Sequence, residues 1–213
     1  MTYIENIFLC LALPMLLSLL FTSGSTRRFT LFVVLGMATC LLSAYVSSFF
    51  MGRHQCSAVT TAIEIAPVCE EILKLLPLLL YFLIFEPDSH KLTPAAIGIA
   101  VGFATFENVC YLTENGAGSF VFLLIRGMSA GALHLVCGIL TGLALAYVFR
   151  RPWLTCTGTV GILGVCMVLH GIYNLLITAE GFWQMVGYFF PSAIIATLFA
   201  ARLLHRGRHT VFR

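Results

Sequence analysis

The sequence predicts an all-α membrane protein, a polytopic bundle of about seven transmembrane helices. Of its 213 residues, 60% are hydrophobic and only 10% are charged, which is far from the balance of a soluble domain. Long apolar runs recur along the whole chain, and a helix needs about 20 such residues to cross the hydrocarbon core. The runs lack the polar alternation of barrel strands, so helices are the structure that satisfies their backbone in lipid.

Seven apolar runs mark the expected helices. The connections are short, and no stretch is long or polar enough for a soluble domain, so residues 1–213 are expected to form one integral-membrane domain. No basic residue precedes the first run, which favours a retained span with its amino terminus outside over a cleaved signal peptide. The runs cover residues 4–21, 29–51, 58–85, 92–112, 120–149, 153–178 and 182–204.

Basic residues predict how the bundle is oriented. Cytoplasmic loops near span ends are enriched in Lys and Arg, so we expect the carboxyl terminus in the cytoplasm. Of the twelve Lys and Arg residues, Lys74 and Arg126 lie within spans, and Arg53 alone lies on the outer side. This distribution favours contact with anionic lipid headgroups over nucleic acid. The nine on the cytoplasmic side are Arg27, Arg28, Lys91, Arg150, Arg151, Arg202, Arg206, Arg208 and Arg213.

Cysteines and glycines in the spans are expected to serve packing. The eight cysteines are scattered without metal-like spacing, although a pair between Cys56 and Cys110 on the outer side stays open. Two glycine pairs, Gly98 with Gly102 and Gly138 with Gly142, would let helices approach closely within one chain or between chains.

The third run carries two adjacent carboxyls and a lysine, Glu70, Glu71 and Lys74. A charged side chain at the bilayer centre costs about 2.5 to 3.5 kcal/mol, so such groups usually face a partner or a cavity. Lys74 lies one turn from both carboxyls and can pair with either, which leaves the other free for acid and base chemistry. A structural ion pair is the plainer interpretation. Pro67 and Pro77 flank the motif and predict a kink around it.

Further polar residues in the next three runs are candidates for the same acid and base site. Each alone is explained as readily by structure, since a single buried His is more often a core residue than a catalyst. Counted from the span ends, the groups spread over ~14 Å, from the midplane into the outer leaflet, and kinks can bring them to one outward-facing cavity. The residues are Phe103, Glu107, Asn108 and Tyr111 in the fourth run, Arg126 and His134 in the fifth, and His170 and Asn174 in the sixth.

The ordered motifs resemble those of the PrsW family of intramembrane proteases. They are Glu-Glu-x-x-Lys at 70–74, Phe-x-x-x-Glu-x-x-x-Tyr at 103–111, the Arg126 to His134 span and His-x-x-x-Asn at 170–174. The series is distantly similar also to the CAAX prenyl endopeptidase and bacteriocin-processing superfamily. The resemblance covers about half the chain. The family pattern often ends in His-x-x-x-Asp, so Asn174 departs from it and makes a metal-ligand role at this position less favourable.

The resemblance implies a peptide-bond hydrolase in the bacterial cytoplasmic membrane that acts on membrane-anchored substrates. In bacteria such enzymes typically cut an anti-sigma factor on its extracytoplasmic side. We expect Glu70 or Glu71 to be the general base, His134 or Glu107 to orient the water, and His170 and Asn174 to stabilise the oxyanion. No cofactor is favoured.

Three alternatives stay open at this point. The first is a zinc-dependent version of the same protease, in which Glu71, His134 and His170 hold Zn²⁺. The second is a proton-coupled transporter, since such proteins also bury Glu, His and Lys. The third is a non-catalytic membrane binding protein built on the same scaffold.

Overall fold

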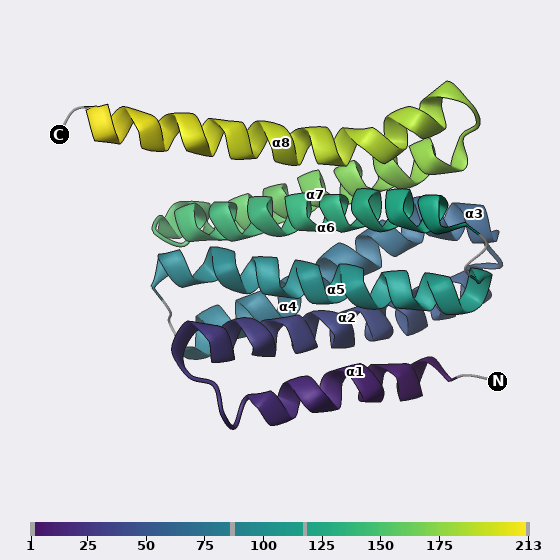
Figure 1. Ribbon diagram of the computed structural model, residues 1–213, viewed down its shortest axis with the longest axis horizontal. Helices are drawn as coiled ribbons and strands as arrows, with labels where there is room; N and C mark the ends of the chain where they lie inside the picture. Colours follow the sequence, from purple (N-terminus) through teal and green to yellow (C-terminus); the bar gives the residue numbers. More distant parts are fainter. Residues whose placement is uncertain (1–2, 86–87, 117–118, 212–213) are drawn as a thin grey trace.

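The computed structural model describes residues 3–85, 88–116 and 119–211, and the regular secondary structure of these residues is entirely helical. Most helices begin and end within about five residues of the predicted runs. The run 58–85 is divided into a short helix, a π turn and a longer helix, and the last helix ends seven residues beyond the run 182–204. Short connections keep successive helices side by side (Figure 1). The helices are α1 (Ile4–Ser18), α2 (Gly24–His54), α3 (Ala58–Thr60), α4 (Ala66–Phe85), α5 (Leu92–Asn115), α6 (Phe120–Val148), α7 (Thr155–Thr178) and α8 (Phe182–Val211).

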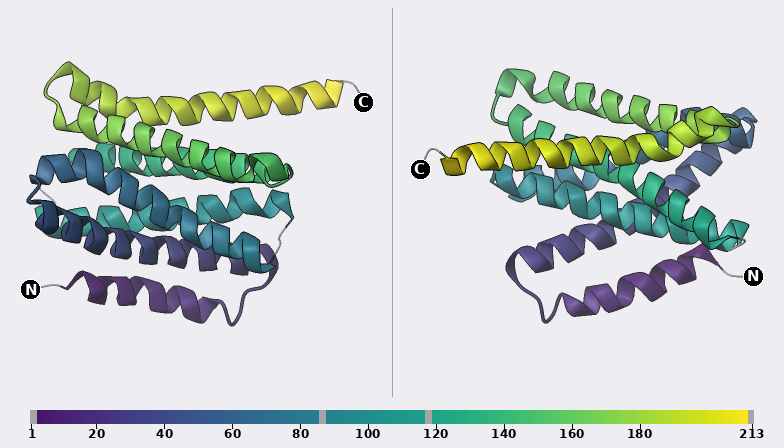
Figure 2. Two further views of the ribbon diagram at one scale, coloured as in Figure 1. Left: turned by 180° about the vertical axis from the view of Figure 1, so that it is seen from behind. Right: turned by 45° about the horizontal axis from the view of Figure 1, so that its top comes forward.

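Five stretches of the described helices are long and apolar enough to cross a membrane: 24–54, 89–114, 120–148, 155–178 and 182–201. Several such stretches are typical of a multi-pass membrane protein, while the count of seven spans stays a prediction. Helix α1 has only 15 residues, and α4 carries Glu70, Glu71 and Lys74 within its 20. Helix α1 lies at one side of the bundle and α8 at the other (Figures 1 and 2).

The connections fall into two groups at opposite ends of the bundle. Those after α1, α4 and α6 gather at the end where α8 finishes, and those after α2, α5 and α7 lie at the other end (Figure 1). Five basic residues lie in or beside the first group, namely Arg27, Arg28, Lys91, Arg150 and Arg151. Their clustering at one end agrees with the charge asymmetry, and the assignment of that end to the cytoplasm stays a prediction.

Glycines bring α2, α5 and α6 into close contact. A Cβ atom on Gly102 would lie 1.9 Å from the Val33 carbonyl oxygen, and one on Gly36 would lie 2.1 Å from that of Ile99. A Cβ on Gly138 or Gly142 would likewise lie within 2.7 Å of an α5 atom. Both predicted glycine pairs therefore pack helices within the chain, where small residues let backbones approach in lipid.

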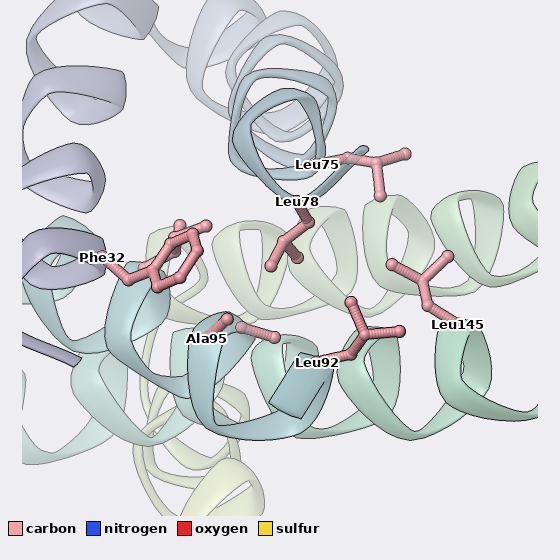
Figure 3. Close-up of a cluster of buried hydrophobic side chains, with 8 residues drawn as sticks. Phe32, Leu75, Leu78, Leu92, Ala95 and Leu145 are labelled. Carbon is pink, nitrogen blue, oxygen red and sulfur yellow. The ribbon is translucent and has the colours of Figure 1, made fainter. Parts of the chain in front are cut away.

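The apolar core is divided among the helices. One cluster joins α2, α4, α5 and α6 and includes Phe32, Leu78 and Leu145 (Figure 3). A second joins α1, α2 and α5 around Met37 and Phe106, and a third joins α6 to α7. All eight cysteines, each within the described residues, are free thiols, so the Cys56–Cys110 pair that the sequence left open is not formed.

A π turn at Thr61–Ile65 leads the chain from α3 into α4. The Ala66 amide donates to the Thr61 carbonyl, five residues back. The next amide in that pattern would serve the Ala62 carbonyl, but it belongs to Pro67, which has no N–H. Pro67 thus leaves a backbone acceptor without a donor in its own helix, just before the two glutamates.

Candidate active site

A cavity of about 210 Å³ lies between α4, α5, α6 and α7. Its polar lining comes from residues that the sequence singled out, with Tyr173 and Thr178 added. Lining of this kind is what a hydrolase needs, because a buried reaction centre requires bases, hydrogen-bond donors and cations at fixed positions. The charged and polar lining residues common to both sets are Glu70, Glu107, Arg126, His134, His170 and Asn174.

The two glutamates of α4 occupy different surroundings. Glu71 is 4% exposed, and its Oε1 lies 2.5 Å from Lys74 Nζ and 3.0 Å from His170 Nδ1. Glu70 lines the cavity, and its Oε2 is buried without a hydrogen-bond partner among the described residues, 3.7 Å from His170 Nε2. Lys74 therefore holds one carboxylate, and the other is free to act on a bound molecule.

His134 connects the lysine to the carboxylate of α5. Its Nδ1 lies 3.0 Å from Lys74 Nζ, and its Nε2 lies 2.5 Å from Glu107 Oε2. Since an ammonium can only donate, Nδ1 accepts from Lys74 and Nε2 donates to Glu107. His134 is 1% exposed, and both of its nitrogens are used, so it is held in one tautomer and one orientation.

Arg126 closes the network on the side of α5 and α6. Its guanidinium donates to Glu107 Oε1 at 3.2 Å and to Asn108 Oδ1 at 2.5 Å. The guanidinium carbon lies 3.7 Å from the centre of the Tyr111 ring, which adds a cation–π contact. Arg126 is one of the residues that the sequence singled out in the fifth run. The structure places it in the lining of the cavity.

Phe103 packs against two members of the polar network, Lys74 and His134. It is fully buried, its ring lies 4.5 Å from Lys74 Nζ, and its ring centre is 4.9 Å from that of His134. It therefore fixes the lysine and the histidine by packing and lies outside the cavity lining.

Asn174 reaches the acceptor that Pro67 leaves open. Its Nδ2 donates to the Ala62 carbonyl at 2.7 Å, so the sixth span is joined to the π turn of the third. One of the two N–H groups of this amide is therefore used by the backbone. Its second N–H remains at the cavity.

Sequence reasoning missed two features of the cavity. Tyr173 is 3% exposed, lines the cavity and shares a 2.9 Å hydrogen bond with Ser129 of α6. Its position beside Asn174 was the available signal. The π turn was signalled by Pro67 in the middle of an apolar run, which predicted a kink without its type.

The residue types of the cavity fit a metal ion in part. Ligand atoms of Glu70, His134 and His170 all lie within 4.8 Å of one another, and two histidines with a carboxylate are a common Zn²⁺ set. The sequence expected Glu71 in this set, but Glu71 is held by Lys74, and Glu70 takes its place. The unpartnered Glu70 oxygen suits a ligand role. His134 would have to release one of its two hydrogen bonds.

The geometry provides the parts of a hydrolytic site. Because a carboxylate only accepts, His170 donates from Nδ1 to Glu71, and in the neutral imidazole its Nε2 is then an acceptor that faces Glu70. Two acceptors beside a cavity can orient and deprotonate a water, while Arg126 and the second N–H of Asn174 can receive a developing negative charge.

Comparisons with known proteins agree with the motifs. A family model described as "PrsW family intramembrane metalloprotease" matches residues 16–201. The chain is similar to the Protease PrsW of Bacillus subtilis (strain 168), with 28% identity over 116 residues, 52% of this chain and 49% of that protein. It is also similar to the Protease PrsW of Geobacillus kaustophilus (strain HTA426), with 27% identity over 141 residues, 64% of this chain and 59% of that protein.

These matches cover different shares of the chain and of its relatives. The chain spans between about half and three-fifths of the length of the two curated relatives. No solved structure matches it. The family match, in contrast, runs from α1 into α8 and includes every residue of the cavity lining. The chain belongs to the PrsW family of intramembrane proteases.

Proposed function

We propose that this protein is an intramembrane endopeptidase that hydrolyses a peptide bond of a membrane-anchored protein, with Glu70 as the general base. The observation that carries the proposal is the buried Glu70 oxygen, which has no hydrogen-bond partner among the described residues and lines a cavity among charged side chains. A buried acceptor without a partner is rare and needs an explanation. A water molecule that reacts with the peptide bond would be the missing hydrogen-bond donor.

The water would donate hydrogen bonds to Glu70 and to Nε2 of His170, which leaves a lone pair of its oxygen for the scissile carbonyl. Glu70 takes one proton as the new C–O bond forms, and Arg126 and Asn174 stabilise the oxyanion. The protonated Glu70 then gives its proton to the leaving amine as the C–N bond breaks. The sum is one water added across one peptide bond.

The surrounding groups would have positioning roles. Glu71 fixes the ring of His170, and Lys74 fixes Glu71 and His134. Glu107 holds His134 and Arg126, so that the cation stays at the cavity. This division revises the expectation from sequence, in which either glutamate could be the base and His170 was an oxyanion donor.

Metal activation is the second candidate, and the set of Glu70, His134 and His170 favours it. A metal ion bound by them would polarise the carbonyl and make a bound water more acidic. Both candidates require Glu70 and His170, so substitutions of these residues do not separate them.

Substrate and cellular location follow from the same proposal. The bacterial relatives and the charge asymmetry support a bacterial cytoplasmic membrane, with the amino terminus outside. A single-span anti-sigma factor cut near its extracytoplasmic side is the substrate we propose. A transporter is less well supported, since the matching family is described as proteases.

The test is cleavage of a single-span protein by the purified chain in detergent. We expect Glu70→Gln and His170→Ala to abolish cleavage, by at least about a hundredfold for loss of an acid–base group. Glu64→Gln is the matched control, because Glu64 is an exposed acid two turns earlier. Full cleavage by Glu70→Gln contradicts the proposal. Activity that persists after metal removal supports Glu70 as the base, and activity restored only by added Zn²⁺ supports the second candidate.

A further inference from the structure

A second cavity, of about 300 Å³, lies at the end of the bundle where α2 and α5 begin. It is separate from the candidate active site and shares no lining residue with it. One wall carries the side chains of Ser25, Arg28, His90 and Lys91. Its inner part is aromatic, formed by Phe32 and Tyr81.

The inner part of the cavity is firmly built. The Phe32 and Tyr81 rings meet edge to face with their centres 5.0 Å apart, and Phe32 is only 4% exposed. Phe32 belongs to the apolar cluster that joins α2, α4, α5 and α6 (Figure 3). Gly98 of α5 packs against it, because a Cβ on Gly98 would lie 2.9 Å from the Cβ of Phe32.

The polar wall carries a free cation. Lys91 is paired with Asp88 at 2.7 Å, but the Arg28 guanidinium has neither a hydrogen-bond nor an ion-pair partner within the described part of the chain. Among the described residues, no acidic side chain lines the cavity. A guanidinium presents paired N–H donors that match the oxygens of a phosphate. The polar wall can therefore bind a phosphate group directly, and no metal ion is needed to neutralise the phosphate.

The position of the cavity decides the source of that phosphate. The membrane-spanning stretches 24–54 and 89–114 both begin beside it. Its cationic wall is thus at the boundary of the bilayer, where lipid headgroups lie, and its aromatic part suits the glycerol and acyl groups below a headgroup. Inorganic phosphate has no apolar group that could pack against the aromatic rings.

We propose that this cavity binds the headgroup phosphate of an anionic phospholipid, with Arg28 as the principal ligand and Ser25, His90 and Lys91 beside it. Binding at this site is independent of peptide hydrolysis at Glu70.

The experiment is native mass spectrometry of the purified chain in a non-ionic detergent, titrated with phosphatidylglycerol or with phosphatidylcholine of the same acyl chains. We expect phosphatidylglycerol to bind more tightly. Arg28→Gln should weaken it at least about fivefold, which corresponds to about 1 kcal/mol for one basic residue at a membrane surface. Arg27→Gln is the matched control, because it removes the same charge from the neighbouring position, outside the cavity lining.

Three results would overturn the proposal. Equal weakening by Arg27→Gln and Arg28→Gln would mean that only the overall charge of this end attracts lipid. Equal affinity for the two lipids would remove the role of the phosphate charge. Competition by inorganic phosphate at the concentrations at which the lipid binds would assign the cavity to free phosphate. Far-ultraviolet circular dichroism of both variants checks that the helices are retained.

Discussion

The same three helices, α4, α5 and α6, meet in two different ways along their length. At the level of Glu71 and Lys74 they are joined by a polar network around a cavity. Directly after Lys74, from Leu75 to Leu78, they are joined by an apolar cluster with Leu92 and Leu145 (Figure 3). Lys74 and Leu75 are adjacent in the chain and belong to different levels.

The difference teaches what holds a bundle together in lipid. Apolar side chains gain little by leaving lipid tails for one another, so the apolar level depends on shape, and glycines allow the close fit. The polar level has no such freedom, because each charge must have a partner or a cavity. We therefore expect single substitutions to reduce stability more at the polar level than at the apolar level. The exception is a substitution that adds atoms where two helices are in close contact.

Lys74→Met should have the largest effect on stability. It removes the cation nearest Glu71, which is 4% exposed, and loss of one partner of a buried ion pair costs about 3 to 5 kcal/mol. The double variant Lys74→Met/Glu71→Gln should recover most of this loss, since no charge is left unpaired. The free energy of unfolding in detergent, followed by circular dichroism during titration with dodecyl sulfate, gives both values.

Leu75→Met is the control at the apolar level. It changes the neighbouring residue to the same side chain at nearly constant volume, for which we expect less than about 1.5 kcal/mol. If Leu75→Met were as harmful as Lys74→Met, the two levels would not differ as we argue.

Gly102→Ala tests the close fit and should come next. Its added Cβ would lie 1.9 Å from the Val33 carbonyl oxygen, so α2 and α5 must separate, at a cost of about 1 to 3 kcal/mol. Gly161→Ala adds the same atom to α7 with no heavy atom within 4 Å and should be neutral or slightly stabilising. The unfolding midpoints of the two variants in dodecyl sulfate provide the comparison. Equal midpoints would show that α2 and α5 can adapt.

The two levels also differ in how well the sequence predicted them. The helices could be located because apolar runs of about 20 residues have one meaning in a membrane. The residues of the polar level could be singled out because buried charges are rare, and Glu70, Lys74, Glu107, His134 and His170 all lie in one network or beside it. The composition of the apolar runs and the positions of the charged residues within them carry this information directly.

What the sequence could not supply was the pairing of these groups. Spacing allowed Lys74 to pair with Glu70 or Glu71, and only the rotation of α4 against α6 and α7 selects Glu71. Depth counting separated His134 from Glu107 by several residues, yet their side chains meet at 2.5 Å, since tilt and span ends are set by packing between helices. For the same reason the sequence could not decide which carboxylate meets both histidines. We expected Glu71 in a metal set, whereas it is Glu70 that has a ligand atom within 4.8 Å of those of His134 and His170.

Asn174→Ala should have the smallest effect of the three substitutions, because Asn174 contributes one neutral hydrogen bond at the edge of the polar level. Without its amide, the Ala62 carbonyl loses the donor that compensates for Pro67, which costs about 0.5 to 1.5 kcal/mol. The loss should be local. Hydrogen exchange followed by mass spectrometry should show faster exchange in the segment 58–66 and little change in α5. Thr178→Ala, one turn later on α7, is the control, since that hydroxyl bonds the Leu175 carbonyl of its own helix. Unchanged exchange at 58–66 in Asn174→Ala would mean that the π turn is held by the rest of α4, and that Asn174 acts mainly at the cavity.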